Sequence, residues 1–187
     1  RPHGGRLGPD GASFYSVNMM SFELVELDAY GFEITRRLSL GDGVMPTWVT
    51  SPSPTGKLYV TGNNVAKIFE IDVETWQIER TFETGAGPYN LDVSPDGTRL
   101  VATYKGADAV GFWDLELGVE TTRTSTSRTI PHGVVITPDG EYAFVTLEGV
   151  GADPGTVEVF RVNTGERVAS VDVGKQAGGI AFWKMES

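Results

Sequence analysis

One short stretch returns along this chain and decides its fold. It reads Pro-Tyr-Asn-Leu-Asp-Val-Ser-Pro-Asp-Gly over residues 88–97 and Pro-His-Gly-Val-Val-Ile-Thr-Pro-Asp-Gly over residues 131–140. A third copy occupies residues 2–11, and a fourth, at residues 46–56, has one extra residue and ends in Ser-Pro-Thr-Gly. Pro presets φ in such a turn and Gly accepts a positive φ. Each copy is therefore predicted to be a short strand that ends in a tight turn.

The spacing of the copies predicts the architecture. They start at Pro2, Pro46, Pro88 and Pro131, and a partial copy starts at Ala177, so the steps are 44, 42, 43 and 46 residues. About 40–50 residues make one four-stranded propeller blade. We predict an all-β chain, a β-propeller of four-stranded antiparallel blades, with four blades and one further strand present. The repeat units are residues 2–45, 46–87, 88–130 and 131–176, with a partial unit at 177–187.

Within a unit, apolar runs and turn residues predict the strands. The first strand is short, as at 133–136. The second strand is expected at 57–61, 99–104 and 141–147, the third at 67–72, 110–115 and 156–163, and the fourth at 76–84, 121–129 and 166–173. The predicted core residues are Val60, Val101, Val134, Ile136 and Phe144. The residues expected to pack between blades are Trp48, Trp76, Trp113 and Trp183.

Composition and motifs exclude several function classes. The chain has 187 residues, with 25 Asp and Glu against 15 Lys and Arg, and a net charge of −10. This sign disfavours nucleic-acid binding, and no apolar run is long enough to span a membrane. The chain contains no Cys, which excludes disulfides and thiolate catalysis. Nucleotide-binding, serine-hydrolase and zinc-protease motifs are absent as well.

The repeat resembles a known family. Residues 58–63, Leu-Tyr-Val-Thr-Gly-Asn, followed by Ile71-Asp72 and Thr75, are similar to the YVTN-type β-propeller repeat, and the resemblance covers essentially the whole chain. Residues 112–114, Phe-Trp-Asp, echo the WD40 repeat, but the matching positions in the other units read Leu-Asp, Ile-Asp and Val-Asn. The resemblance to YVTN propellers implies an extracytoplasmic location, periplasmic or at the cell surface. The empty motif scan and the acidic composition favour a module that binds a protein partner or supports a larger complex.

The number of units raises the question of ring closure. Propellers of the YVTN type mostly have seven blades, which the resemblance implies here. The chain opens at the first strand of a unit and ends in a lone apolar segment at 179–183. We expect the remaining blades to come from upstream residues or from another chain, with Phe182 and Trp183 buried in the completed ring. A closed four-bladed ring and an assembly of two chains are the alternatives.

The two histidines of the chain share one repeat position. His3 and His132 each follow the Pro that opens a unit, where Thr47 and Tyr89 stand in other units. In a propeller, this position lies near one mouth of the central channel. We interpret these residues as structural, hydrogen bonded to a neighbouring blade. The alternative is that His3 and His132 ligate copper or a haem iron, because imidazole suits both metals and some YVTN-type propellers carry such groups.

A second candidate lies in the hairpin at 147–155, which is longer than its counterparts. Long loops often carry function. Its Glu148 and Asp153 are candidate metal ligands, although acids in a Gly-rich loop are also explained by solvation. The Asp of each Pro-Asp-Gly turn is instead explained by turn chemistry.

Two functions follow from these residues. The first is a non-catalytic β-propeller binding or scaffold module, an extracytoplasmic protein-interaction subunit with no catalytic residue and no cofactor. The alternative is a redox or hydrolytic propeller enzyme, haem- or copper-bearing or lactonase-like, that uses the channel-mouth histidines. A visible absorbance band or a stoichiometric metal would favour the second function.

Overall fold

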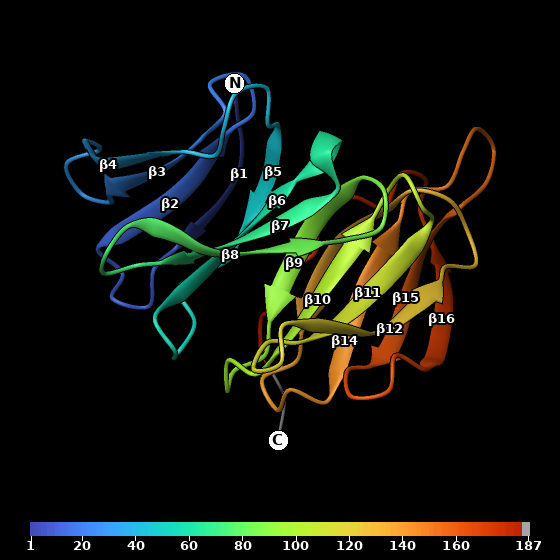
Figure 1. Cartoon of the computed structure of the whole chain (residues 1–187). Helices are drawn as coiled ribbons and strands as arrows, with labels where there is room; N and C mark the ends of the chain where they lie inside the picture. Colours follow the sequence, from blue (N-terminus) through green and yellow to red (C-terminus); the bar gives the residue numbers. More distant parts are fainter. Residues whose placement is uncertain (185–187) are drawn as a thin grey trace. The chain divides into compact units, whose positions relative to one another are not determined.

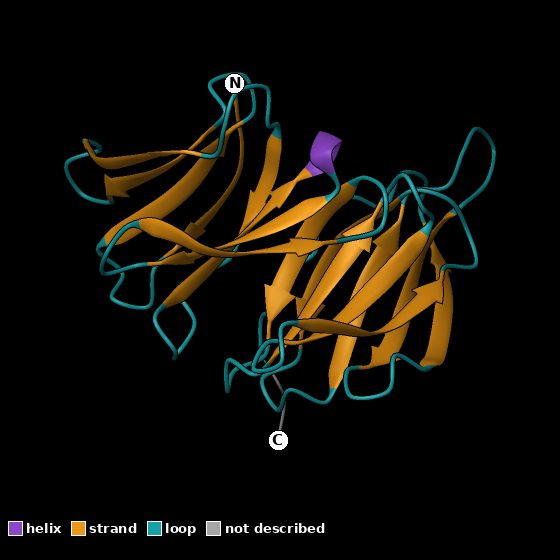
Figure 2. Cartoon of the chain, viewed as in Figure 1, coloured by secondary structure: helices purple, strands orange, loops and turns teal. Residues whose placement is uncertain are grey.

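The computed structural model describes residues 1–184, which consist almost entirely of strands, hairpins and turns (Figure 1). Within these residues, strands β1 to β16 form four antiparallel sheets of four strands each. Figure 2 shows one short helical turn, η1 (Asn63–Val65). We name the sheets blades 1 to 4 in chain order, and the strands of each blade lie side by side in sequence order.

The strand bounds follow the repeat. Blade 1 consists of β1 (Pro2–Leu7), β2 (Ser13–Asn18), β3 (Glu23–Asp28) and β4 (Ile34–Ser39). Blade 2 consists of β5 (Pro46–Val49), β6 (Lys57–Gly62), β7 (Lys67–Asp72) and β8 (Gln77–Glu83). Blade 3 consists of β9 (Pro88–Val93), β10 (Arg99–Tyr104), β11 (Ala109–Asp114) and β12 (Val119–Ser125). Blade 4 consists of β13 (Pro131–Ile136), β14 (Tyr142–Leu147), β15 (Gly155–Arg161) and β16 (Arg167–Val173).

The strands predicted within the four full repeat units are confirmed, with small shifts at their ends. The segments expected at 67–72 and 99–104 match β7 and β10 residue for residue. The largest shift concerns β12, which starts at Val119 rather than at 121 and ends earlier than expected. The turn residue Gly118, with φ +69°, lies directly before it, and Thr126 already leaves the sheet.

Two compact units divide the chain, Arg1–Leu91 and Asp92–Ser187. Unit 1 contains blades 1 and 2 and the first residues of β9, and unit 2 contains the rest of blade 3 and blade 4. Residues 1–184 include no helix that is long and apolar enough to cross a membrane.

Side chains alternate between the two faces of each blade, and the buried faces form the cores. In blade 2, Leu58, Val60 and Ile71 share one face and are buried with Tyr15 and Val17 of blade 1. We call the face turned toward the preceding blade the leading face and the opposite one the trailing face. A fully buried aliphatic side chain contributes about 1.5–3 kcal/mol, so this interface accounts for much of the stability of unit 1.

Unit 2 repeats this arrangement between blades 3 and 4. Val145, Leu147 and Phe160 on the leading face of blade 4 are buried in one cluster with Val101 and Phe112 of blade 3. The rings of Phe112 and Phe160 lie 5.7 Å apart, a distance typical of packed aromatic pairs. The two units therefore use the same kind of blade interface.

One of the five core predictions, that Phe144 is buried, is wrong. The predicted core residues that the structure buries are Val60, Val101, Val134 and Ile136. Phe144 is only half-buried, because it lies on the trailing face of blade 4, in register with Val135 and Val159. Its neighbours along β14, Ala143 and Val145, point to the leading face and are 0% exposed.

The strand predicted at 179–183 does not form. Residues 177–184 have no regular secondary structure, and Trp183 is 88% exposed. A single strand is not stable without a partner strand, and this segment pairs with none of the described strands. The prediction that Trp183 packs between blades is therefore wrong for this chain, whereas Trp113 is buried and Trp48 and Trp76 are partly buried.

Candidate functional site

The strand that carries the family resemblance, β6, uses its tyrosine to hold a buried ion pair. Tyr59 donates its hydroxyl to Glu70 at 2.9 Å, and Glu70 accepts from Arg80 Nε and Nη2 at 2.7 and 2.6 Å. The side chain of Glu70 is 2% exposed. Burial and the adjacent Glu70 charge raise the pKa of Tyr59 far above its usual value, so its hydroxyl stays a donor. The three residues lie in register across β6, β7 and β8, on the trailing face of blade 2.

Blade 1 contains a matching set in the same register, Tyr15, Glu26 and Arg36. Arg36 donates to both carboxylate oxygens of Glu26 at 2.7 Å, and this hydrogen bonding lowers the pKa of Glu26. Arg36 also reaches blade 2, where Nη1 donates to Val73 O at 2.7 Å and the guanidinium lies 4.2 Å from the centre of the Trp76 ring. We call these two sets the Tyr–Glu–Arg groups. Both groups lie across paired strands and fix strand register, and Arg36 of the first group also connects blade 1 to blade 2.

A threonine on the second strand of three blades connects each of them to the next repeat unit. The pairs are Thr61 with Tyr89 O at 3.2 Å, Thr103 with His132 O at 2.9 Å, and Thr146 with Gly178 O. The carbonyl of Gly178 therefore takes the position of the Tyr89 and His132 carbonyls, as the repeat predicts for the partial unit. Asn63 adds a second link, from Nδ2 to Pro88 O at 3.2 Å.

The Pro-Asp-Gly carboxylates serve their own turns. Asp96 accepts from Ser94 Oγ at 2.5 Å and from Thr98 N at 3.0 Å, and these bonds lower its pKa. Asp139 accepts from the Thr137 hydroxyl in the same way, and its pKa is lowered as well. A carboxylate that accepts local donors is stabilised as the anion, which is a turn function rather than a catalytic one.

The predicted channel-mouth residues of unit 1 lie together. His3 Nδ1 lies 2.7 Å from Thr47 O, and Tyr89 Oη lies 3.0 Å from His3 Nε2. A carbonyl only accepts, so Nδ1 carries the proton in the neutral imidazole and Nε2 accepts from the Tyr89 hydroxyl. Thr47 Oγ1 donates to Tyr89 O at 2.8 Å. His3, Thr47 and Tyr89 thus connect the first strands of three successive repeat units.

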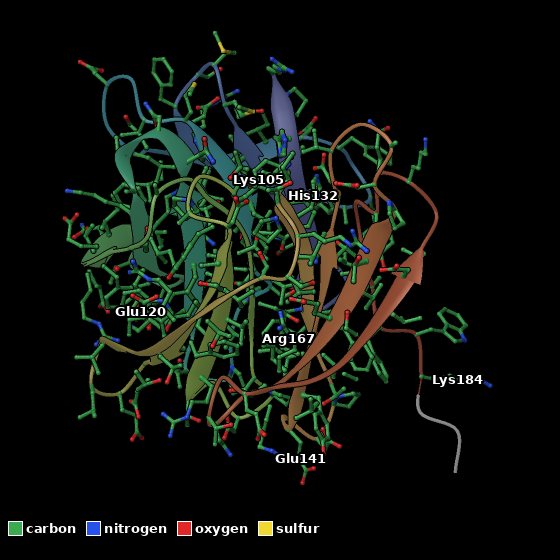
Figure 3. The ribbon with its side chains drawn as sticks, turned by 90° about the vertical axis from the view of Figure 1, so that its right-hand side faces the viewer. Lys105, Glu120, His132, Glu141, Arg167 and Lys184 are labelled. Carbon is green, nitrogen blue, oxygen red and sulfur yellow. The ribbon has the colours of Figure 1, made fainter. Side chains whose placement is uncertain are left out.

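The predicted residues of unit 2 form a second polar group, which we call the rim cluster. Lys105 Nζ donates to Glu148 Oε1 at 2.7 Å, and His132 Nε2 lies 3.5 Å from the same oxygen. Each of these side chains is between 20% and 24% exposed. Figure 3 shows Lys105 and His132 at one end of the blades of unit 2, with Glu141 at the other end. Two cationic or protonatable groups therefore converge on Glu148.

The long hairpin forms a small pocket beside the rim cluster. The pocket has a volume of 280 Å³ and is lined by Glu148, Asp153, Lys175 and neighbouring loop residues. Glu148 is already paired with Lys105, and Lys175 brings a second positive charge to the pocket wall. These two lysines disfavour a bound metal cation between Glu148 and Asp153.

The chain does not fit a two-histidine haem or copper centre inside either unit. Each unit contains one histidine, and both ring nitrogens of His3 already face hydrogen-bond partners. Among residues 1–184, no group of three or more His, Cys, Asp or Glu side chains is arranged to hold a metal ion.

Comparison with known proteins settles the fold class. No model of a known protein family matches the chain, and no curated protein matches it. A hydrazine synthase structure from Kuenenia stuttgartiensis matches with a TM-score of 0.84 and 22% identity, over 92% of this chain and 49% of that one. The chain has a β-propeller fold. At such identities the match shows the fold alone.

Two further solved structures agree. A functionally unknown protein from Desulfotomaculum acetoxidans DSM 771 gives a TM-score of 0.76 at 16% identity, over 92% of this chain and 56% of that one. A chain of the mitotic checkpoint complex gives 0.79 at 16% identity, over 94% and 52%. This propeller chain thus spans about half the length of the solved structures that it matches.

Reasoning from the sequence missed three features of the site. It did not identify Lys105 as the partner of Glu148, because the two residues lie 43 positions apart and the contact crosses from one unit of the repeat to the next. It also missed the Tyr–Glu–Arg groups and the threonine links. Their signal was present: Thr61, Thr103 and Thr146 recur at one repeat position, as do Glu26 and Glu70.

Proposed function

We propose that this chain is a non-catalytic β-propeller module that binds a protein partner or holds a place in a larger complex. The observation that carries the proposal is that the buried acids and the turn acids already have structural partners. The buried acids pair with arginines of the same blade, and the turn acids accept from their own turns. Matched propellers include a component of a mitotic checkpoint complex, which supports an interaction role.

We further propose that the repeats are of the YVTN type and that the protein is extracytoplasmic. Each residue of Tyr59-Val60-Thr61-Gly62-Asn63 except the glycine has a structural task. Tyr59 holds Glu70, Val60 is 0% exposed, and Thr61 and Asn63 contact the next unit. These tasks supply a physical reason for a repeat with this consensus.

The partner-binding surface in this proposal is the rim of unit 2. The loop between β14 and β15 presents Val150, which is 57% exposed, next to the 280 Å³ pocket. An exposed apolar residue among polar groups is typical of an interaction site. The test is co-purification of the tagged intact protein from its natural source. Val150→Asp should lose a stoichiometric partner, whereas Leu117→Asp, at a turn residue that is 73% exposed, should keep it. Equal retention by both variants would contradict this surface.

The alternative is a redox or hydrolytic propeller enzyme, and the rim cluster is the observation that favours it. His132 and Lys105 converge on Glu148 beside a pocket, and all three side-chain types can serve as general acids or bases. The purified protein should show no visible absorbance band and no stoichiometric metal if it is a binding module. A haem band or one equivalent of copper would overturn the non-catalytic proposal.

A further inference from the structure

In blade 1, we use the term leading face for the face that matches the leading face of blade 2 in register, and this face is apolar and exposed. Leu7, Phe14, Leu27 and Ile34 form one cross-strand row over β1 to β4. In blade 2, Leu58 and Ile71 match Phe14 and Leu27 and are 0% exposed because blade 1 covers them, whereas Phe14 is 36% exposed and Leu27 is only partly buried. Above this row lies a groove of 370 Å³, lined by Leu7, Phe14, Leu27, Asp28, Ala29 and Phe32.

The interface between blades 1 and 2 shows which side chains of a preceding blade contact a leading face. The corner between β7 and β8 carries Trp76, whose ring lies 4.2 Å from the Arg36 guanidinium and 6.2 Å from the Tyr15 ring. Arg36 Nη1 donates to Val73 O in the same corner. The leading face of blade 2 therefore accepts an arginine through an aromatic ring and a backbone carbonyl.

Blade 1 has the same corner. Phe32 adopts φ +57° and Trp76 φ +56°, and each donates its N–H to the Asp that ends the third strand, Asp28 or Asp72. Ala29 occupies the position of Val73: their N–H groups donate to Ala12 O and Gly56 O, at 2.7 and 3.0 Å. Phe32 is 81% exposed, so the aromatic ring of this corner has no cover comparable to that of Trp76.

We propose that the leading face of blade 1 docks the trailing face of another β-blade that carries its own Tyr–Glu–Arg group. The arginine of that blade stacks on Phe32 and donates to the Ala29 carbonyl, and its tyrosine and apolar neighbours fill the groove over Phe14 and Leu27. Charge supports this occupant, since Asp28 is the charged residue in the groove lining and it attracts a cation.

The last blade of a second copy of this chain does not meet these requirements. Its trailing face has Phe144, Val159 and Ala169 in the register positions of Tyr59, Glu70 and Arg80. That row offers Phe32 no cation. The arginine of a Tyr–Glu–Arg group does not always reach the next blade: the Arg80 guanidinium lies 5.2 Å from the centre of the Phe82 ring, on its own strand. The acceptor corner of Phe32 is what selects an arginine that reaches across, as Arg36 does.

The test places a photo-reactive phenylalanine analogue at position 32 in cells that produce the intact natural polypeptide. The cross-linked peptide should be the fourth strand of a β-blade, with an arginine, from a blade with Tyr in its second strand and Glu in its third. The matched control carries the analogue at Leu117, an exposed turn residue of blade 3, and should not give this product. A cross-link to residues 142–173 of a second copy, to any other peptide, or no cross-link would overturn the proposal.

A pair of substitutions gives a second readout that does not depend on the partner proposed for the rim. Phe32→Arg should lower the thermal midpoint of the intact polypeptide by about 2–4 °C, because it replaces a cation–π contact by repulsion. Phe32→Trp, which keeps an aromatic ring in the corner, should leave the midpoint at the wild-type value. Equal midpoints for Phe32→Arg and the wild type in the intact polypeptide would contradict the docking proposal while leaving the proposed function untouched.

Discussion

The buried carboxylate of Glu70 offers the sharpest test of how the blades are held. Glu70→Gln keeps the shape of the side chain but removes its charge, and it leaves Arg80 without its counter-ion. Breaking a buried ion pair from one side costs about 3–5 kcal/mol. The Arg80 side chain is 41% exposed and regains part of its hydration, which reduces the expected loss to about 2–3 kcal/mol.

The assay is urea unfolding of the chain at neutral pH, followed by tryptophan fluorescence and far-ultraviolet circular dichroism. Trp76 lies in the turn of blade 2 that packs against blade 1, so its contribution to the fluorescence reports on this region. The matched control is Glu83→Gln on the neighbouring strand, where the carboxylate is 76% exposed and pairs with Lys67 at 3.2 Å. This exposed pair should contribute at most about 0.5 kcal/mol.

A clear result separates the two variants by about 2 kcal/mol in the free energy of unfolding. If Glu70→Gln unfolds at the same urea concentration as the wild type, the Tyr–Glu–Arg group does not stabilise blade 2. Tyr59→Phe then serves as an independent check, since loss of a hydroxyl donor to a buried carboxylate should cost about 1.5 kcal/mol.

Three further predictions follow from the packing and the electrostatics. Phe160→Ala should cost about 3–5 kcal/mol in urea unfolding, because Phe160 is 0% exposed, and Phe144→Ala should cost clearly less; equal losses would contradict the assignment of faces. The lowered pKa of Glu26 stabilises the fold fully above the ordinary glutamate pKa of about 4.3, and this stability is lost as the pH falls through the lower pKa of the folded state, so the gap between wild type and Glu26→Gln should shrink as the pH falls below about 4.3. Thr103→Val should lower the stability of unit 2 by about 1–2 kcal/mol because the part-buried His132 carbonyl loses the hydroxyl of the buried Thr103 as a donor, whereas Thr103→Ser, which keeps the hydroxyl, should retain most of the wild-type stability.

The fold was predictable because the repeat is local. Each strand and its turn lie within one stretch of the period, so the Pro-Asp-Gly turn and the apolar alternation of β10 or β7 identify them without tertiary knowledge. The error at Phe144 has a different origin. Alternation shows that two sets of residues face opposite ways, but both faces of a blade are apolar when blades pack on both sides. Which face is covered depends on the neighbouring blade, and that is not a property of β14.

The candidate site was predictable in position but not in its contacts. The shared repeat position of His3 and His132 correctly indicated structural equivalence at the start of the first strand. The partners of these residues come from other units: Tyr89 for His3, and Glu148 for His132, which Lys105 joins. Such contacts depend on how close the loops of neighbouring blades lie to one another. The spacing of residues in a single sequence does not give the distance between two loops of different blades.

The threonine links have a consequence for how such chains change in evolution. Thr61, Thr103 and Thr146 each bind a main-chain carbonyl of the following unit, and every amino acid supplies that carbonyl. The receiving residue is therefore free to be Tyr89, His132 or Gly178 without loss of the link. A gene duplication can insert one more unit of about 43 residues. The inserted unit can accept a hydrogen bond from the threonine of the preceding unit and donate one from its own threonine to the following unit. The residue whose carbonyl accepts the hydrogen bond can thus diversify at once, while the threonine that donates the hydrogen bond stays under constraint.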